Sequence, residues 1–92
     1  MDSNSGQYSL EIAKRVDRKF SKMAKKEQWL LEVIDKKIRQ ILANPGHFKP
    51  LRGDMFGARR VHIENSFVLT YEVDFERKIV RILDFEHHDK VY

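Results

Sequence analysis

The sequence predicts an α+β protein of two layers, with an N-terminal strand and a two-helix hairpin packed on one face of an antiparallel sheet. Apolar residues recur at helical spacing between about residues 13 and 42. They alternate with polar residues in three consecutive segments between residues 57 and 83, as in strands with one buried face. The chain of 92 residues is long enough for one domain with a two-layer core.

The first half of the chain predicts one strand and two helices. Residues 1–6 are small and polar, so we expect a disordered tail there and a single domain over residues 7–92. Alternation from Tyr8 to Ile12 indicates a short strand, and a first helix follows over about residues 13–24. The stripe of the second helix, which ends at Asn44-Pro45-Gly46, predicts a core face made by Leu30, Ile34, Ile38, Ile41 and Leu42.

The second half predicts three strands, over residues 59–63, 67–73 and 78–83. A two-residue turn at Asn65-Ser66 would pair His62 with Leu69, whereas a three-residue turn over residues 64–66 pairs it with Val68. We favour the longer turn because it collects the apolar residues on the helical side.

In this register the face away from the helices is open to a ligand. Arg60 lies opposite Thr70, and His62 points the same way. A four-residue loop over residues 74–77 would also bring Arg81 beside Thr70. Arg60, His62 and Arg81 would then share the open face, within reach of the C-terminal residues 87–92.

Composition limits the class of protein. No apolar run approaches the roughly 18 residues that a membrane span needs, no signal peptide opens the chain, and there is no cysteine. We therefore expect a cytoplasmic protein. The net charge is +4, and basic residues are concentrated between Lys14 and Lys26. They form either a solvated helix face or a surface for an acidic partner, nucleic acid or protein.

The residues of the open face are suited to cleavage of an RNA phosphodiester bond. Imidazole titrates near working pH and serves as general base or general acid. The guanidinium group donates two parallel hydrogen bonds to phosphate. The sequence His87-His88-Asp89 lacks the spacing of a metal site, and no cofactor-binding motif is present, so we expect neither metal nor cofactor.

Several segments resemble the RelE/ParE toxin superfamily, and within it the YafQ and RelE/StbE branch. A proline, leucine, glycine and aspartate precede the histidine-bearing strand, and a histidine and an aromatic residue end the chain. The matching segments are residues 49–54, 60–64, 67–71 and 88–92.

The resemblance implies a toxin of a type II toxin–antitoxin pair, a metal-independent endoribonuclease that cuts mRNA in the ribosomal A site. It assigns catalysis to His62, His88 and Tyr92. It also implies three partners: an antitoxin whose acidic segment wraps the toxin, the ribosome and mRNA.

Two sets of basic residues would serve RNA binding. We expect phosphate contacts from Lys49, Arg52, Arg59, Arg60 and Arg81. The first helix would contact ribosomal RNA through Lys14, Arg15, Arg18, Lys19 and Lys22.

The chain departs from the superfamily's pattern at three positions. Lys49 stands where the YafQ branch has histidine, and Ser66 where it has aspartate. Val68 stands where other RelE branches have a phosphate-binding arginine. Two alternatives remain: a ParE-like toxin that inhibits gyrase without being a nuclease, and a small basic RNA-binding module without catalysis.

Overall fold

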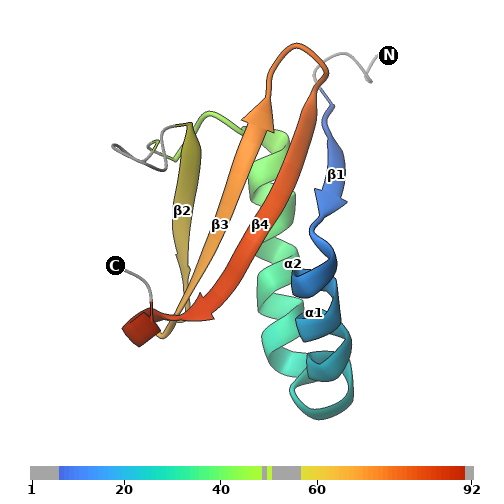
Figure 1. Cartoon of the computed structure of the whole chain (residues 1–92), viewed down its shortest axis with the longest axis vertical. Helices are drawn as coiled ribbons and strands as arrows, with labels where there is room; N and C mark the ends of the chain where they lie inside the picture. Colours follow the sequence, from blue (N-terminus) through green and yellow to red (C-terminus); the bar gives the residue numbers. More distant parts are fainter. Residues whose placement is uncertain (1–6, 49, 51–56, 91–92) are drawn as a thin grey trace.

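The computed structural model describes residues 7–48, 50 and 57–90, so the expected tail lies outside the described residues. The elements follow in the order strand, two helices, three strands and a short 3₁₀ turn (Figure 1). They are β1 (Ser9–Ile12), α1 (Lys14–Lys26), α2 (Gln28–Ala43), β2 (Ala58–Ile63), β3 (Phe67–Asp74), β4 (Ile79–His87) and η2 (His88–Lys90). Within this described part no helix is long and apolar enough to cross a membrane.

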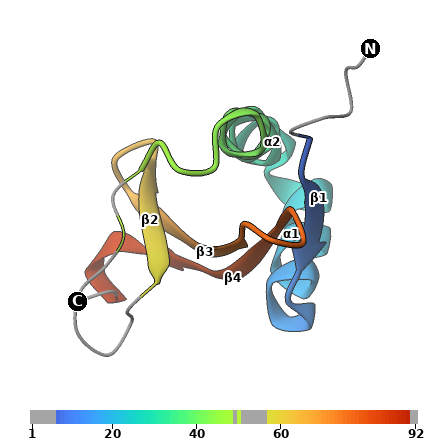
Figure 2. The ribbon, with the colours of Figure 1, turned by 90° about the horizontal axis from the view of Figure 1, so that it is seen from above.

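The strands form one sheet in the order β1-β4-β3-β2, and the sheet curls around α2 (Figure 2). The two hairpins are antiparallel as predicted, whereas β1 runs parallel to β4. The sheet is therefore mixed. A parallel pair needs a long crossover connection, and the two helices lie within the segment that joins β1 to β4. The predicted class of fold, a helical pair on one face of a sheet, is confirmed.

The β2–β3 hairpin has the predicted register. Ile63 pairs with Phe67, and His62 pairs with Val68. The turn has positive φ at Glu64 (53°) and Asn65 (61°). The Ser66 amide donates to the Ile63 carbonyl across 3.3 Å. Because Ile63 pairs with Phe67, Ser66 is the third residue of the loop, as the predicted three-residue turn requires.

The β3–β4 hairpin differs from the prediction. Asp74 still pairs, with Ile79, so the loop comprises residues 75–78 and Arg81 pairs with Glu72 instead of Thr70. The Asp74 carboxylate accepts a hydrogen bond of 2.9 Å from the Arg77 amide, which closes the turn one residue later than expected. The predicted position of Arg81 beside Thr70 is therefore wrong, although Arg81 still lies on the face away from the helices. β4 also runs four residues beyond Leu83, where we expected it to end.

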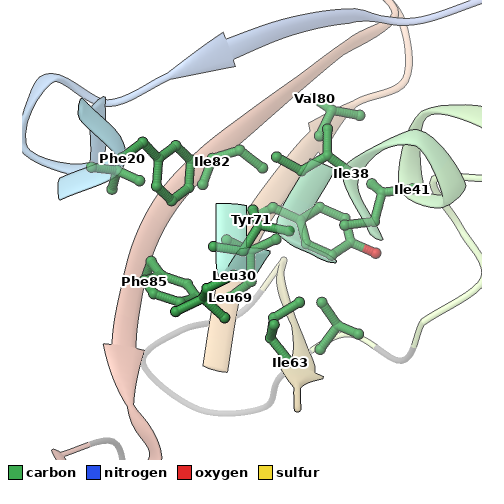
Figure 3. Close-up of a cluster of buried hydrophobic side chains, with 13 residues drawn as sticks. Phe20, Leu30, Ile38, Ile41, Ile63, Leu69, Tyr71, Val80, Ile82 and Phe85 are labelled. Atoms are coloured by element: carbon green, nitrogen blue, oxygen red, sulfur yellow. The ribbon is translucent and has the colours of Figure 1, made fainter. Parts of the chain in front are cut away.

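The core lies between the helices and the concave face of the sheet. The predicted stripe of α2 is buried at Leu30, Ile34, Ile38 and Ile41. Tyr71 is fully buried among them (Figure 3), and its hydroxyl donates to the Pro45 carbonyl across 3.3 Å. Burial raises the pKa of Tyr71 to about 12, although the positive charge of Arg59 opposes the shift.

Candidate functional site

Two histidines meet at one end of the sheet, on the face away from the helices. His62 of β2 and His88 of η2 are both exposed, and their ring centroids are 5.4 Å apart. The His88 amide donates to the Ser66 carbonyl across 2.6 Å, which fixes η2 to the β2–β3 turn. The tight hairpin and this hydrogen bond thus bring together two residues that are 26 positions apart in the sequence.

His87 lies on the other face of the sheet. It pairs with Phe67, and the two rings meet edge to face at 5.3 Å. Its Nδ1 lies 3.6 Å from a carboxylate oxygen of Asp89. Adjacent histidines thus point to opposite faces, and among the described residues no group of three or more histidine or acidic side chains is placed to hold a metal ion.

Arg60 lies on the same face as the histidine pair and near the same end of the sheet. It pairs with Thr70, two residues from His62 along β2, and is half-buried. Its Nε atom is buried and has no hydrogen-bond partner among the described residues. Its guanidinium therefore places a positive charge on the face that carries the histidine pair, where it favours an anion.

Two other predicted phosphate contacts lie elsewhere. Arg59 is next to Arg60 on β2, and neighbouring strand residues point to opposite faces, so Arg59 lies on the helical side of the sheet. Its Nη1 donates to the Phe48 carbonyl, and its guanidinium carbon lies 5.8 Å from the centre of the Phe75 ring. These contacts join Arg59 to Phe48, which follows α2, and to Phe75 of the β3–β4 loop, so Arg59 does not join the histidine pair.

Arg81 lies at the far end of the sheet, where two carboxylates neutralise it. Its guanidinium is 2.9 Å from Glu11 and 3.2 Å from Glu72. The hydrogen bonds that Arg81 donates to Glu11, followed by the charges of both carboxylates, raise the pKa of Arg81. Arg81 thus ties β1, β4 and β3 together.

Three predicted site residues lie outside the described residues, namely Lys49, Arg52 and Tyr92. Ser66 and Val68, where the sequence departs from its relatives, are described. Ser66 contributes its backbone carbonyl to the site, as the acceptor for His88. Val68 is 3% exposed beneath this end of the face.

The five basic residues expected at the ribosome divide into two groups. Lys19 donates to the Phe85 carbonyl across 2.7 Å and lies 2.8 Å from Glu86, and Arg15 donates to the Leu83 carbonyl across 3.1 Å. Both therefore hold α1 against β4. Lys14, Arg18 and Lys22 are exposed.

Sequence reasoning missed a groove between α1 and the end of the sheet that carries the histidines. The groove has a volume of about 630 Å³, with an aromatic floor and lysines along its rim. Its lining includes Phe67, Phe85, His87, Lys25 and Lys26. The signal was present as the Lys25-Lys26 pair, which ends the basic segment that begins at Lys14.

The match to a toxin family model, together with the arrangement of two helices on a four-stranded sheet, makes this chain a toxin of the RelE/ParE superfamily. The chain belongs to the family described as ParE toxin of type II toxin–antitoxin systems, whose model matches residues 10–92. It is 44% identical over 85 residues to an uncharacterised protein of Methanosarcina mazei, covering 92% of this chain and 99% of the relative. It is 41% identical over 85 residues to the protein named "Putative toxin RelE4" of Methanocaldococcus jannaschii, covering 92% of this chain and 90% of the relative.

Solved structures share the fold at lower identity. The YoeB/ParE toxin of Agrobacterium tumefaciens superposes with a TM-score of 0.78 at 20% identity, over 87% of this chain and 98% of the toxin. A chain of the RelBE2 toxin–antitoxin complex of Mycobacterium tuberculosis gives 0.72 at 23% identity, over 89% and 99%. YafQ of Escherichia coli gives 0.60 at 21% identity, over 94% and 99%. The recognition of this superfamily from the sequence is confirmed.

Proposed function

We propose that this toxin is a metal-independent endoribonuclease that cleaves mRNA in the ribosomal A site, with His62 and His88 as its acid–base pair. The observation that carries the proposal is the position of the two exposed rings, 5.4 Å apart on one face and fixed by the bond from His88 to Ser66. A phosphodiester placed on their open side can reach both imidazoles. Histidine is suited to both proton transfers near neutral pH.

The reaction needs two proton transfers and charge stabilisation. One imidazole takes the proton of the 2′-hydroxyl, whose oxygen then attacks phosphorus. The other imidazole gives a proton to the departing 5′-oxygen, which leaves a 2′,3′-cyclic phosphate. Either histidine can take either role in this geometry. The positive charge of Arg60, two residues from His62 on the same face, stabilises the charge on the phosphate oxygens.

Two partners follow from this proposal. An antitoxin neutralises the toxin in the cytoplasm through an acidic segment that complements the net charge of +4. Solved toxin–antitoxin complexes of Mycobacterium tuberculosis, Staphylococcus aureus and Escherichia coli with the same toxin fold support such a partner. The ribosome positions the mRNA, because in-line attack needs a bent strand and positioning can supply several kcal/mol of the barrier.

The direct test is the His88→Ala variant. Its rate of cleavage of ribosome-bound mRNA should fall by about 10²–10⁴-fold, whereas its binding to ribosomes should be unchanged. His47→Ala is the matched control because His47 is an exposed histidine beyond the far end of α2, in contact with Phe48. Equal cleavage by both variants would contradict the assignment.

Gyrase inhibition is the second candidate because the matching family model describes the ParE toxin. The paired histidines favour the nuclease, since a binding protein needs no acid–base pair. A supercoiling assay with purified gyrase separates the two candidates. We expect no inhibition by wild-type toxin at concentrations that cleave mRNA, and inhibition without cleavage would establish the alternative. RNA binding without either activity would instead favour the non-catalytic module.

A further inference from the structure

The groove beside α1 has the composition of a site for single-stranded nucleic acid. Phe67 lines its floor and stacks at 5.2 Å on Phe85, which is 3% exposed, and the His87 ring meets Phe67 edge to face. Four lysines of α1 line it, and Lys19 among them is held by Glu86 and the Phe85 carbonyl. The other three are Lys22, Lys25 and Lys26, all exposed. Aromatic rings that accept a base, beside cations that contact the backbone, are typical of such sites.

The groove adjoins the histidine pair. His87 lines the groove, and His88, the next residue, faces His62 on the other side of the sheet. A strand that leaves the histidine pair therefore enters the groove after passing the edge formed by these two residues.

The opposite end of the open face is unsuited to RNA. A second cavity there, of about 550 Å³, is lined by Glu11, Glu72, Asp74 and Glu76 together with Arg77 and Arg81. Two of these carboxylates pair with Arg81, and Asp74 lies 3.9 Å from Arg77. Its four carboxylates outnumber its two arginines and repel phosphate.

We propose that the groove between α1 and the sheet holds the RNA nucleotides next to the scissile phosphate. Lys22, Lys25 and Lys26 contact their phosphates, and one base packs against Phe67. The inference rests on the proposed ribonuclease function and names the path of its substrate. An apolar–acidic peptide is a different occupant of the same groove, but the stacked rings and the rim of cations favour RNA.

Binding to an oligoribonucleotide of about twelve residues tests the proposal. The parent protein is the His62→Ala/His88→Ala variant, so that no cleavage occurs, and its affinity is measured between low and moderate salt. Adding Lys22→Gln and Lys26→Gln should reduce the slope of log affinity against log salt by about 1.4, since each phosphate contact on a single strand contributes about 0.7. Adding Phe67→Leu instead should weaken binding at least about fivefold without changing this slope.

The matched control adds Lys36→Gln and Lys78→Gln, which remove the same charge from exposed positions that do not line the groove. Its slope should change by less than half as much. Thermal unfolding of each variant establishes that it is folded. Equal salt slopes for the two double-lysine variants would overturn the proposal. It would also be overturned if the Lys22→Gln/Lys26→Gln change left RNA affinity at the parent's value and abolished antitoxin binding. Failure of the wild-type protein to cleave mRNA would instead contradict the ribonuclease function, which this binding measurement does not use.

Discussion

Tyr71 is the largest of the fully buried side chains in the described residues, and it carries the hydroxyl that holds Pro45. Its burial has a consequence for alkaline stability. In the unfolded chain the phenol ionises near pH 10, whereas in the fold its pKa is about 12. Between these values the folded state holds more protons than the unfolded state, so the free energy of unfolding decreases as pH rises.

We therefore expect the stabilisation due to Tyr71 to be complete below about pH 10 and to be lost as the pH rises toward about 12. The loss should be on the order of 2 kcal/mol. The Tyr71→Phe variant should be about 1 kcal/mol less stable at neutral pH, because it lacks the hydrogen bond to Pro45, and should show a smaller alkaline loss. Urea unfolding of both proteins across this pH range gives the comparison. Parallel losses in the two proteins would contradict this role of the hydroxyl.

Residues of the site differ in how far the sequence predicts them. His62 could be placed because its strand alternates and a short turn leaves two registers, of which one buries the apolar residues. The position of Arg81 could not be predicted in the same way, because it depends on where the β3–β4 turn closes. The hydrogen bond from Arg77 to Asp74 shifts that closure by one residue. The contact of His88 with His62 depends on a backbone bond to Ser66, which has no signature in the sequence.

At the scale of elements, α1 protects an edge of the sheet. β1 pairs with β4 only as far as Ile82, so the carbonyls of Leu83 and Phe85 face outward beyond it. Arg15 and Lys19 of α1 donate to these two carbonyls. Side chains thus replace the missing strand and leave a shorter edge for unwanted pairing. In the sequence, the run of basic residues indicates only an exposed helix face. It does not show that Arg15 and Lys19, unlike their neighbours, bind the edge of the sheet.

The Lys19→Gln variant tests this role. It removes one charge, the hydrogen bond to Phe85 and the ion pair with Glu86. We expect the free energy of unfolding to fall by about 1 kcal/mol, which corresponds to a decrease of roughly 4–8 °C in the melting temperature. Lys14→Gln, an exposed change on the same helix, is the control and should shift the melting temperature by less than half as much. Equal shifts would show that Lys19 acts as an ordinary surface lysine.

At the scale of the whole molecule, the histidine pair and the exposed lysines of the groove lie at one end of the sheet, and the acidic cavity lies at the other. The free RNA strand has no fixed bend, so we expect the protein to cut translated mRNA readily and free RNA poorly. Docking on ribosomal RNA would use Lys14 and Arg18, which are four residues apart and therefore on the same side of α1.

The Lys14→Glu/Arg18→Glu variant should therefore cleave ribosome-bound mRNA about tenfold more slowly than the wild type at low salt, and this deficit should shrink as salt is added because the wild type loses more salt-sensitive contacts. Its residual cleavage of free RNA should change much less. Lys36→Glu/Lys78→Glu carries the same charge change at exposed positions outside α1 and serves as the control. Equal losses on ribosomal and free substrate would contradict docking, and free RNA cut as fast as translated message would indicate a stand-alone ribonuclease.

The central claim is tested most directly by the rate at which the His62→Ala/His88→Ala variant cleaves ribosome-bound mRNA. In this assay a chelator removes zinc, and the magnesium that the ribosome needs is retained. The wild type should cleave under these conditions because the proposed chemistry uses side chains alone. The double variant should retain ribosome binding and lose at least about 10²-fold in rate. Cleavage by the double variant at the wild-type rate would contradict the account.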